Sequence, residues 1–184
     1  MIGKLKSALL LVFFTSAFVY ADMASDSKVM LSKYFEAIKM YDTSKMADLM
    51  HPDALKQFRD CFDNAFNGSK SDLAKSEILP ALEVQTIEDY KKLSDREAYK
   101  RFNDFIANSQ PRLVELMKKS QFSIVTENIQ GDISYFTYLL TLNIDGKTIS
   151  KNVVQRPKIN NGQWMLLLAE DAEASIAGIA ARYN

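Results

Sequence analysis

Cysteine and histidine are nearly absent from this 184-residue chain, which has one of each. With Cys61 alone, no intramolecular disulfide can form, so the fold must be held by an apolar core. One histidine and one cysteine also fall short of the three or four ligands that a zinc site needs. We therefore expect no metal, and we expect Cys61 to be buried as a small hydrophobe between Phe58 and Phe62.

Glycine-rich loops and net charge are also missing. No stretch of the sequence has the glycine spacing of a phosphate-binding loop, and no Gly-x-Ser-x-Gly turn indicates a serine hydrolase. We therefore expect no cofactor. Lys plus Arg and Asp plus Glu number 23 each. This balance gives no electrostatic drive toward nucleic acid or anionic membranes, so we expect no nucleic-acid partner.

The first 21 residues have the pattern of a cleavable secretory signal. Two lysines precede an uncharged apolar run from Ala8 to Tyr20, and Ala21 offers a small residue for cleavage. The alternative is a membrane anchor, but a spanning helix needs about 20 apolar residues. We expect residues 1–21 to be removed, residues 22–184 to form one domain, and no stable membrane anchor. The compact leader and the lack of disulfides favour export to a bacterial periplasm or secretion.

Turn residues divide the stretch from Gln121 to Glu170 into apolar runs. Gly131, Asp145-Gly146 and Asn161-Gly162 supply the positive φ angles that tight hairpins need. We expect four antiparallel strands, at about 121–129, 132–144, 147–158 and 163–169. Proline cannot donate to a strand ladder, so the third strand should end near Pro157 or lie at an edge.

The second strand alternates between two faces. Its more apolar face, predicted to be the core face, carries Phe136, Tyr138, Leu140, Leu142 and Ile144. The other face is only half polar, with Ile133, Tyr135 and Leu139, and we expect another element to cover part of it. An exposed apolar face usually marks an interface, so this outer face predicts a homodimer.

Helical spacing and capping residues fill most of the remaining chain. Ser94 and Glu97 form a capping box, and Pro52 and Pro111 suit first helical turns. The expected helices cover about 26–41, 44–50, 52–66, 94–108, 111–119 and 171–183. The stretch 69–93 follows no single period, and we expect either a short helical turn or an irregular crossing there, with a short strand near Leu82–Thr86 as a further alternative.

This order of elements resembles the nuclear-transport-factor-2-like (NTF2-like, or SnoaL-like) superfamily. The residues that carry the resemblance are Tyr34-Phe35-Glu36-Ala37-Ile38, Met46 to Asp53, and Gly162-Gln163-Trp164-Met165-Leu166. The resemblance implies an α+β fold, with N-terminal helices packed on a curved, mostly antiparallel C-terminal sheet that forms a cone. Two stretches depart from the family pattern: a helical insertion at 94–119 and a helix after Glu170. Both could cap or fill the mouth of the cone.

The same resemblance implies a pocket inside the cone. The residues predicted to line it and bind a ligand are Tyr34, Phe58, Tyr138 and Trp164, unless they simply fill the core. For catalysis the weak candidates are His51, Asp53 and Tyr138, although a single histidine beside Pro52 is also a plausible helix joint. The sequence favours an exported module that binds a small apolar ligand or a protein partner. The alternative is a SnoaL-type isomerase, cyclase or dehydratase acting on a small hydrophobic substrate.

Overall fold

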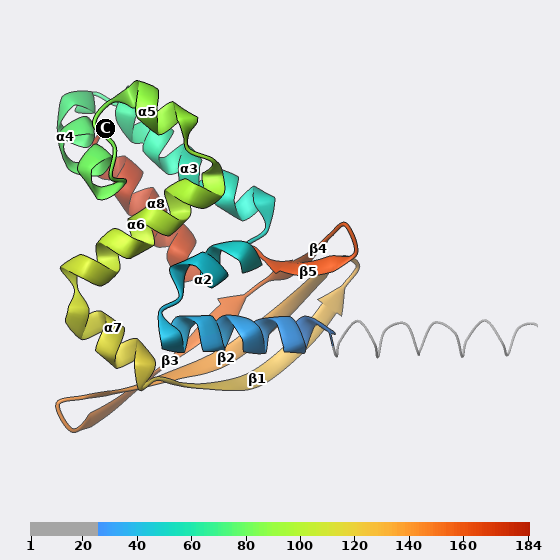
Figure 1. Ribbon diagram of the computed structural model, residues 1–184. Helices are drawn as coiled ribbons and strands as arrows, with labels where there is room; N and C mark the ends of the chain where they lie inside the picture. The colour runs from blue at the N-terminus through green and yellow to red at the C-terminus, as the bar shows by residue number, and fades with distance from the viewer. Residues whose placement is uncertain (1–25) are drawn as a thin grey trace, which may run out of the picture.

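The computed structural model describes residues 26–184, which form helices packed on an open antiparallel sheet (Figure 1). The predicted leader, residues 1–21, lies outside this part. The first helix covers residues 26–40. The helices that follow it are α2 (Thr43–Leu49), α3 (Pro52–Asn67), α4 (Ser71–Ala81), α5 (Ile87–Lys92), α6 (Asp95–Ser109), α7 (Pro111–Lys118) and α8 (Glu170–Arg182). The strands are β1 (Gln121–Gln130), β2 (Ile133–Ile144), β3 (Lys147–Gln155), β4 (Pro157–Asn160) and β5 (Gln163–Leu166). The predicted α+β class is confirmed.

Local chemistry explains where several helices begin. The Ser94 hydroxyl accepts a hydrogen bond from the Glu97 backbone N–H at 3.1 Å, which confirms the predicted cap of α6. Pro52 and Pro111 each occupy the first turn of a helix, where a missing N–H costs nothing.

The strand predicted near Leu82–Thr86 is wrong. The chain forms α4, then a turn in which Glu83 takes a φ of 55°, then α5. The Val84 N–H donates to the Leu79 carbonyl at 3.0 Å and closes the end of α4. Thr86 caps α5 by accepting from the Asp89 N–H at 3.1 Å. Leu82 is fully buried in the hydrophobic core, although it lies in a turn. The sequence around it is therefore apolar without following a helix or strand period.

The sheet is the predicted meander built on hairpins. The order is β1-β2-β4-β5, and β3 also pairs with β2. Gly131, Gly146 and Gly162 have φ angles of 63°, 79° and 81°, which confirms the positive φ predicted for the three turns. Asp145 and Asn161 precede two of them with φ near 50°, the pattern of a type I′ turn.

The third predicted strand is divided into β3 and β4 by Arg156. The Ile159 N–H donates to the Asp132 carbonyl at 2.9 Å, so odd-numbered residues of β4 point their backbone groups toward β2. The missing N–H of Pro157 therefore falls on that side and interrupts the pairing with β2. Pro157 is not at an edge, because β4 lies between β2 and β5. The last strand is also shorter than predicted and ends at Leu166.

The first helix packs across the inner face of the sheet, as predicted. The ring of Phe35 stacks on Phe122 with centroids 4.4 Å apart and meets Tyr138 edge-on at 4.8 Å. Phe136 and Tyr138 are buried, which confirms the predicted core face at the middle of β2. Toward Ile144 the same face is only half-buried.

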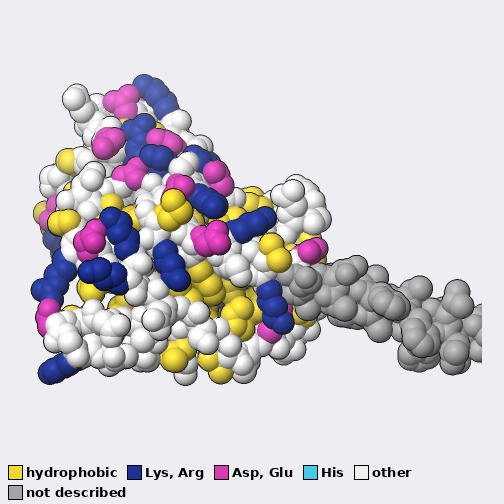
Figure 2. All heavy atoms as spheres, turned by 60° about the horizontal axis from the view of Figure 1, so that its bottom comes forward, with side chains coloured by type: hydrophobic (Ala, Val, Ile, Leu, Met, Phe, Trp, Pro, Cys, Tyr) yellow, Lys and Arg dark blue, Asp and Glu magenta, His cyan; other side chains and the backbone are white. Residues whose placement is uncertain are grey.

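The outer face of the sheet carries half-buried side chains, among them Tyr135 and Leu139. The described helices gather on the other side of the sheet, so we attribute this half-burial to neighbouring strands (Figure 1). Figure 2 shows charged side chains spread over the helical part and hydrophobic ones gathered at the lower centre of the view. The homodimer through the outer face stays a prediction. Within residues 26–184, no helix has both the length and the apolar character to cross a membrane.

The C-terminal helix α8 packs against α3, and its end docks on the loop between α3 and α4. The Lys70 N–H donates to the Tyr183 carbonyl at 2.9 Å, and the Tyr183 hydroxyl donates to Glu77 at 2.7 Å. At the other end of α8, Glu173 forms an ion pair with Arg156 at 2.6 Å. The helix is therefore tied at both ends, to Arg156 at its start and to Lys70 and Glu77 at its end.

Candidate functional site

A cavity of about 280 Å³ lies where the first helix, α3, α6, β3 and α8 meet. Each element contributes to the wall. The side chains that define it are Tyr34 on the first helix, Phe58 on α3, Phe102 on α6, Gln155 at the end of β3, and Ile176 and Ile179 on α8. We call this the apolar cavity. Two of the predicted ligand-binding residues, Tyr34 and Phe58, line it.

Aromatic rings form one wall of the apolar cavity. Phe58 meets Tyr99 edge-on at 5.0 Å and Phe102 at 5.7 Å between ring centroids. Tyr99 and Phe102 are three residues apart on α6, so both reach the same face of that helix. Because Ser94 fixes the start of α6, it also fixes the rotation that turns these rings inward. The wall is rigid and suits flat apolar groups.

Two tyrosine hydroxyls give the apolar cavity a polar point. The hydroxyls of Tyr34 and Tyr99 form a hydrogen-bonded pair, in which either oxygen can be the donor. Burial raises the pKa of the Tyr34 hydroxyl, and it raises the pKa of Tyr99 further. Both hydroxyls therefore stay protonated at physiological pH and serve as hydrogen-bond donors rather than bases.

Two side-chain amides complete the polar part of the lining. Gln155 is 2% exposed, and its Nε2 donates to the Leu167 carbonyl at 2.6 Å. The Nδ2 of Asn103 donates to the Tyr99 carbonyl at 2.8 Å. Among the residues that line this cavity, none is an Asp, Glu, Lys, Arg or His. The site can thus offer hydrogen bonds but no charge.

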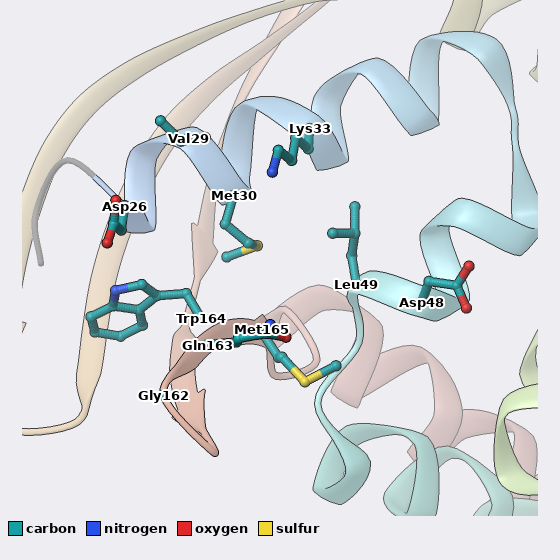
Figure 3. Close-up of a pocket in the computed structure, with 10 residues that line it drawn as sticks. All are labelled: Asp26, Val29, Met30, Lys33, Asp48, Leu49, Gly162, Gln163, Trp164 and Met165. Carbon is teal, nitrogen blue, oxygen red and sulfur yellow. The ribbon is translucent and has the colours of Figure 1, made fainter.

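Trp164, the third predicted ligand-binding residue, lines a different cavity. Figure 3 shows it between the first helix, α2 and the β4–β5 hairpin. Its volume is about 350 Å³. Asp26, Lys33 and Asp48 bring charges of both signs to this cavity, and Met30, Leu49 and Met165 bring apolar surface. Tyr138, the fourth predicted residue, lines neither cavity and packs against Phe35 and Phe122. The structure therefore does not gather the four predicted residues into one site.

His51 forms the joint between α2 and α3. Its Nδ1 accepts a hydrogen bond from the Asp53 N–H at 3.0 Å and caps α3, so its proton lies on Nε2. Its backbone N–H donates to the Leu166 carbonyl at 2.7 Å and attaches the joint to β5. Asp53 is exposed and pairs with Lys158 at 2.9 Å. Neither His51 nor Asp53 lines either cavity, which is the arrangement of a structural joint.

The titration of His51 should be visible in the stability of the protein. Burial lowers the pKa of the folded-state imidazole below its ordinary value near 6.5. As the pH falls below about 6.5, the imidazole binds a proton more readily in the unfolded chain than in the folded protein, so the free energy of unfolding decreases. We expect His51→Asn, which keeps a capping acceptor but does not titrate, to lose less stability than wild type between about pH 7.5 and pH 5. Urea unfolding at the two pH values measures this difference.

A second variant separates the cap from the titration. His51→Ala should be less stable than His51→Asn by about 0.5–2 kcal/mol at either pH, because the Asp53 N–H loses its acceptor and neither side chain titrates. If His51→Asn and wild type lose equal stability on acidification, the neutral buried histidine is disproved. Since His51 is the only histidine in the chain, the comparison is not confused by a second imidazole.

Cys61 is buried, which confirms the prediction. It is 5% exposed, and its Sγ donates to the Ile176 carbonyl at 3.1 Å, joining α3 to α8. Burial raises the pKa of this thiol to about 11, so it is a poor nucleophile. Residues 26–184 contain no cluster of three His, Cys, Asp or Glu side chains that could hold a metal.

Comparison of this chain with family models, curated proteins and solved structures gives no match. The functional argument therefore rests on the geometry of the cavities. Likeness to the NTF2-like superfamily stays a prediction.

Several residues of the apolar cavity were not singled out from sequence as ligand contacts. Tyr99, Phe102 and Ile176 are apolar residues of amphipathic helices, a pattern that indicates inward positions but does not distinguish a cavity wall from the core. Gln155 carried a usable signal: it lies two residues after Val153, so alternation places a polar side chain on the buried face of the strand. A buried polar residue at such a position is more informative than another apolar one.

Proposed function

We propose that this protein is a binding module that holds one small apolar ligand in the apolar cavity. The observation that carries the proposal is the composition of that cavity. It has aromatic and aliphatic walls from five elements and a few converging neutral polar groups, which is the usual make-up of a small-molecule site.

The chemistry of the lining favours binding over turnover. Tyr34 and Tyr99 hold their protons, and the lining residues include no carboxylate or imidazole to act as a base. General acid–base catalysis needs a group whose pKa lies near the working pH. A SnoaL-type reaction would therefore need a base carried by the substrate itself, and we favour the non-enzymatic alternative.

We also propose that the fold is an NTF2-like cone and that the protein is exported. Support for the cone is the first helix lying inside the antiparallel sheet, with the apolar cavity between that helix and the end of β3. Of the two departures noted in the sequence, α6 from the helical insertion and α8 both supply walls of this cavity, whereas α7 does not line it. Support for export is the leader pattern of the first 21 residues.

Native mass spectrometry of the protein purified from its own cells tests the proposal. We expect one small molecule per chain, released on denaturation, or else a protein whose melting temperature rises with small neutral aromatic compounds. A chain that is empty when isolated, and whose melting temperature no such compound raises, would overturn the proposed function.

A further inference from the structure

Some polar atoms that line the apolar cavity have hydrogen-bond partners in the protein, and others do not. Gln155 uses its Nε2 on the Leu167 carbonyl, but its amide oxygen accepts no hydrogen bond from the described residues. A pair of hydroxyls uses one of its two protons internally, so the Tyr34–Tyr99 pair keeps one proton that it can donate. Among the described residues, the unpartnered side-chain atoms that are shut off from solvent are Ser134 Oγ and Arg156 Nε, so the Gln155 oxygen remains accessible to a small molecule. Asn103 also lines the cavity, and no described residue donates to its amide oxygen either, although its side chain is only half-buried. The buried part of the lining thus presents one unfilled acceptor, on Gln155, and one free donor.

The neutral lining restricts the charge of the occupant. Moving a carboxylate or an ammonium group into a site without an opposite charge is strongly unfavourable. No opposite charge is available among the residues that line the apolar cavity. A ligand that carries a formal charge should therefore be rejected, whatever the fit of its apolar part.

The size and shape of the cavity restrict the apolar part. A dry protein cavity of roughly 150 Å³ can hold benzene. The volume here is about 280 Å³, which suits one or two fused rings. The edge-on rings of Phe58, Tyr99 and Phe102 favour a flat occupant.

From these observations we propose that the apolar cavity selects a small, uncharged ring compound that carries a hydroxyl group, such as a phenol or a cyclic alcohol. A hydroxyl suits such a lining because it is both a donor, as the Gln155 oxygen requires, and an acceptor, as the free proton of the Tyr34–Tyr99 pair requires. This inference rests on the proposed function, because it names the ligand class of that same site.

Three probes that share a naphthalene ring test the proposal: 2-naphthol, naphthalene and 2-naphthoate, each titrated by fluorescence. We expect wild type to bind 2-naphthol about tenfold more tightly than naphthalene, because a hydrogen bond is made. It should bind 2-naphthoate about 100-fold more weakly than 2-naphthol, because of the buried charge. In Gln155→Met, the preference for 2-naphthol over naphthalene should fall by several fold while naphthalene still binds.

The control variant is Gln130→Met, which makes the same change at an exposed position of β1 and should leave the preference unchanged. Each variant is judged by the ratio of its dissociation constants for naphthalene and 2-naphthol. A general loss of stability weakens the binding of both compounds and leaves this ratio unchanged. If Gln155→Met does not fold, Tyr34→Phe takes its place, and we expect this variant to reduce the preference for 2-naphthol over naphthalene.

The possible outcomes separate the two proposals. Naphthalene binding as tightly as 2-naphthol, or 2-naphthoate binding as tightly as either, would overturn the hydroxyl class and leave the proposed function standing. A preference for 2-naphthol that survives both Gln155→Met and Tyr34→Phe would also overturn it. If none of the three probes binds, the ligand class is overturned, and the melting-temperature screen then decides the proposed function.

Discussion

Ala172→Trp is expected to weaken the binding of 2-naphthol by at least ~100-fold. Ala172 lines the apolar cavity from α8, and a tryptophan there would place an indole in the space that the ligand occupies. The side chains of Asn103, Gln155, Tyr34 and Tyr99 in the cavity wall are each held by a hydrogen bond. These side chains cannot move aside for an indole without breaking those bonds. The measurement is a fluorescence titration, with the melting temperature recorded for each variant.

The matched control is Ala174→Trp on the same helix. Ala174 is exposed and does not line the cavity, so this variant should bind 2-naphthol as wild type does. If Ala172→Trp binds the probe normally while remaining folded, the ligand does not occupy the apolar cavity. If both tryptophan variants lose binding equally, the loss would reflect disturbance of α8 rather than filling of the cavity.

Gly68→Ala is expected to destabilise the protein by about 1–3 kcal/mol. The reason is space, since Gly68 has an ordinary negative φ of −73°. A Cβ at this position would lie 2.5 Å from the Tyr183 carbonyl oxygen and 2.7 Å from Asn184 Oδ1. The first of these is a backbone atom that also accepts from Lys70, so it cannot move aside without breaking that hydrogen bond. Urea unfolding gives the change in free energy.

Gly178→Ala provides the opposite control. Gly178 lies inside α8, and a Cβ there would meet no atom within 4 Å. This variant should gain about 0.5–1 kcal/mol, because alanine loses less backbone entropy than glycine in a helix. The two alanines are thus expected to change stability in opposite directions. A stable Gly68→Ala would show that the end of α8 does not dock on the α3–α4 loop.

The sequence predicted most of the elements, because their ends depend on neighbouring residues. Asp145-Gly146 needs only its own backbone preference to form a hairpin turn, and Ser94 with Glu97 needs only one turn of helix. The strand predicted near Leu82–Thr86 was wrong because the structure there depends on residues distant in the chain. Leu82 is buried by contacts with distant helices, so its neighbourhood has an apolar composition without a local period.

The residues of the site were harder to predict from the sequence than the elements of the fold. Of the four residues predicted to bind a ligand, Tyr34 and Phe58 line the apolar cavity, Trp164 lines another one, and Tyr138 lines neither. Which aromatic ring faces which space depends on how α6 and α8 pack. Both elements depart from the family pattern, so the resemblance gave no information about the space that they enclose.

The walls of the apolar cavity come from residues as far apart in the chain as Tyr34 and Ile179. No partly folded chain that lacks α8 or the first helix can contain this cavity, so the ligand can recognise only the complete native state. Its binding free energy then adds directly to the free energy of unfolding. At a free concentration of 100 times Kd, the ligand would contribute about 2.7 kcal/mol, a substantial fraction of the total stability of an ordinary domain. Resistance to proteolysis in the cell would then depend on the supply of ligand.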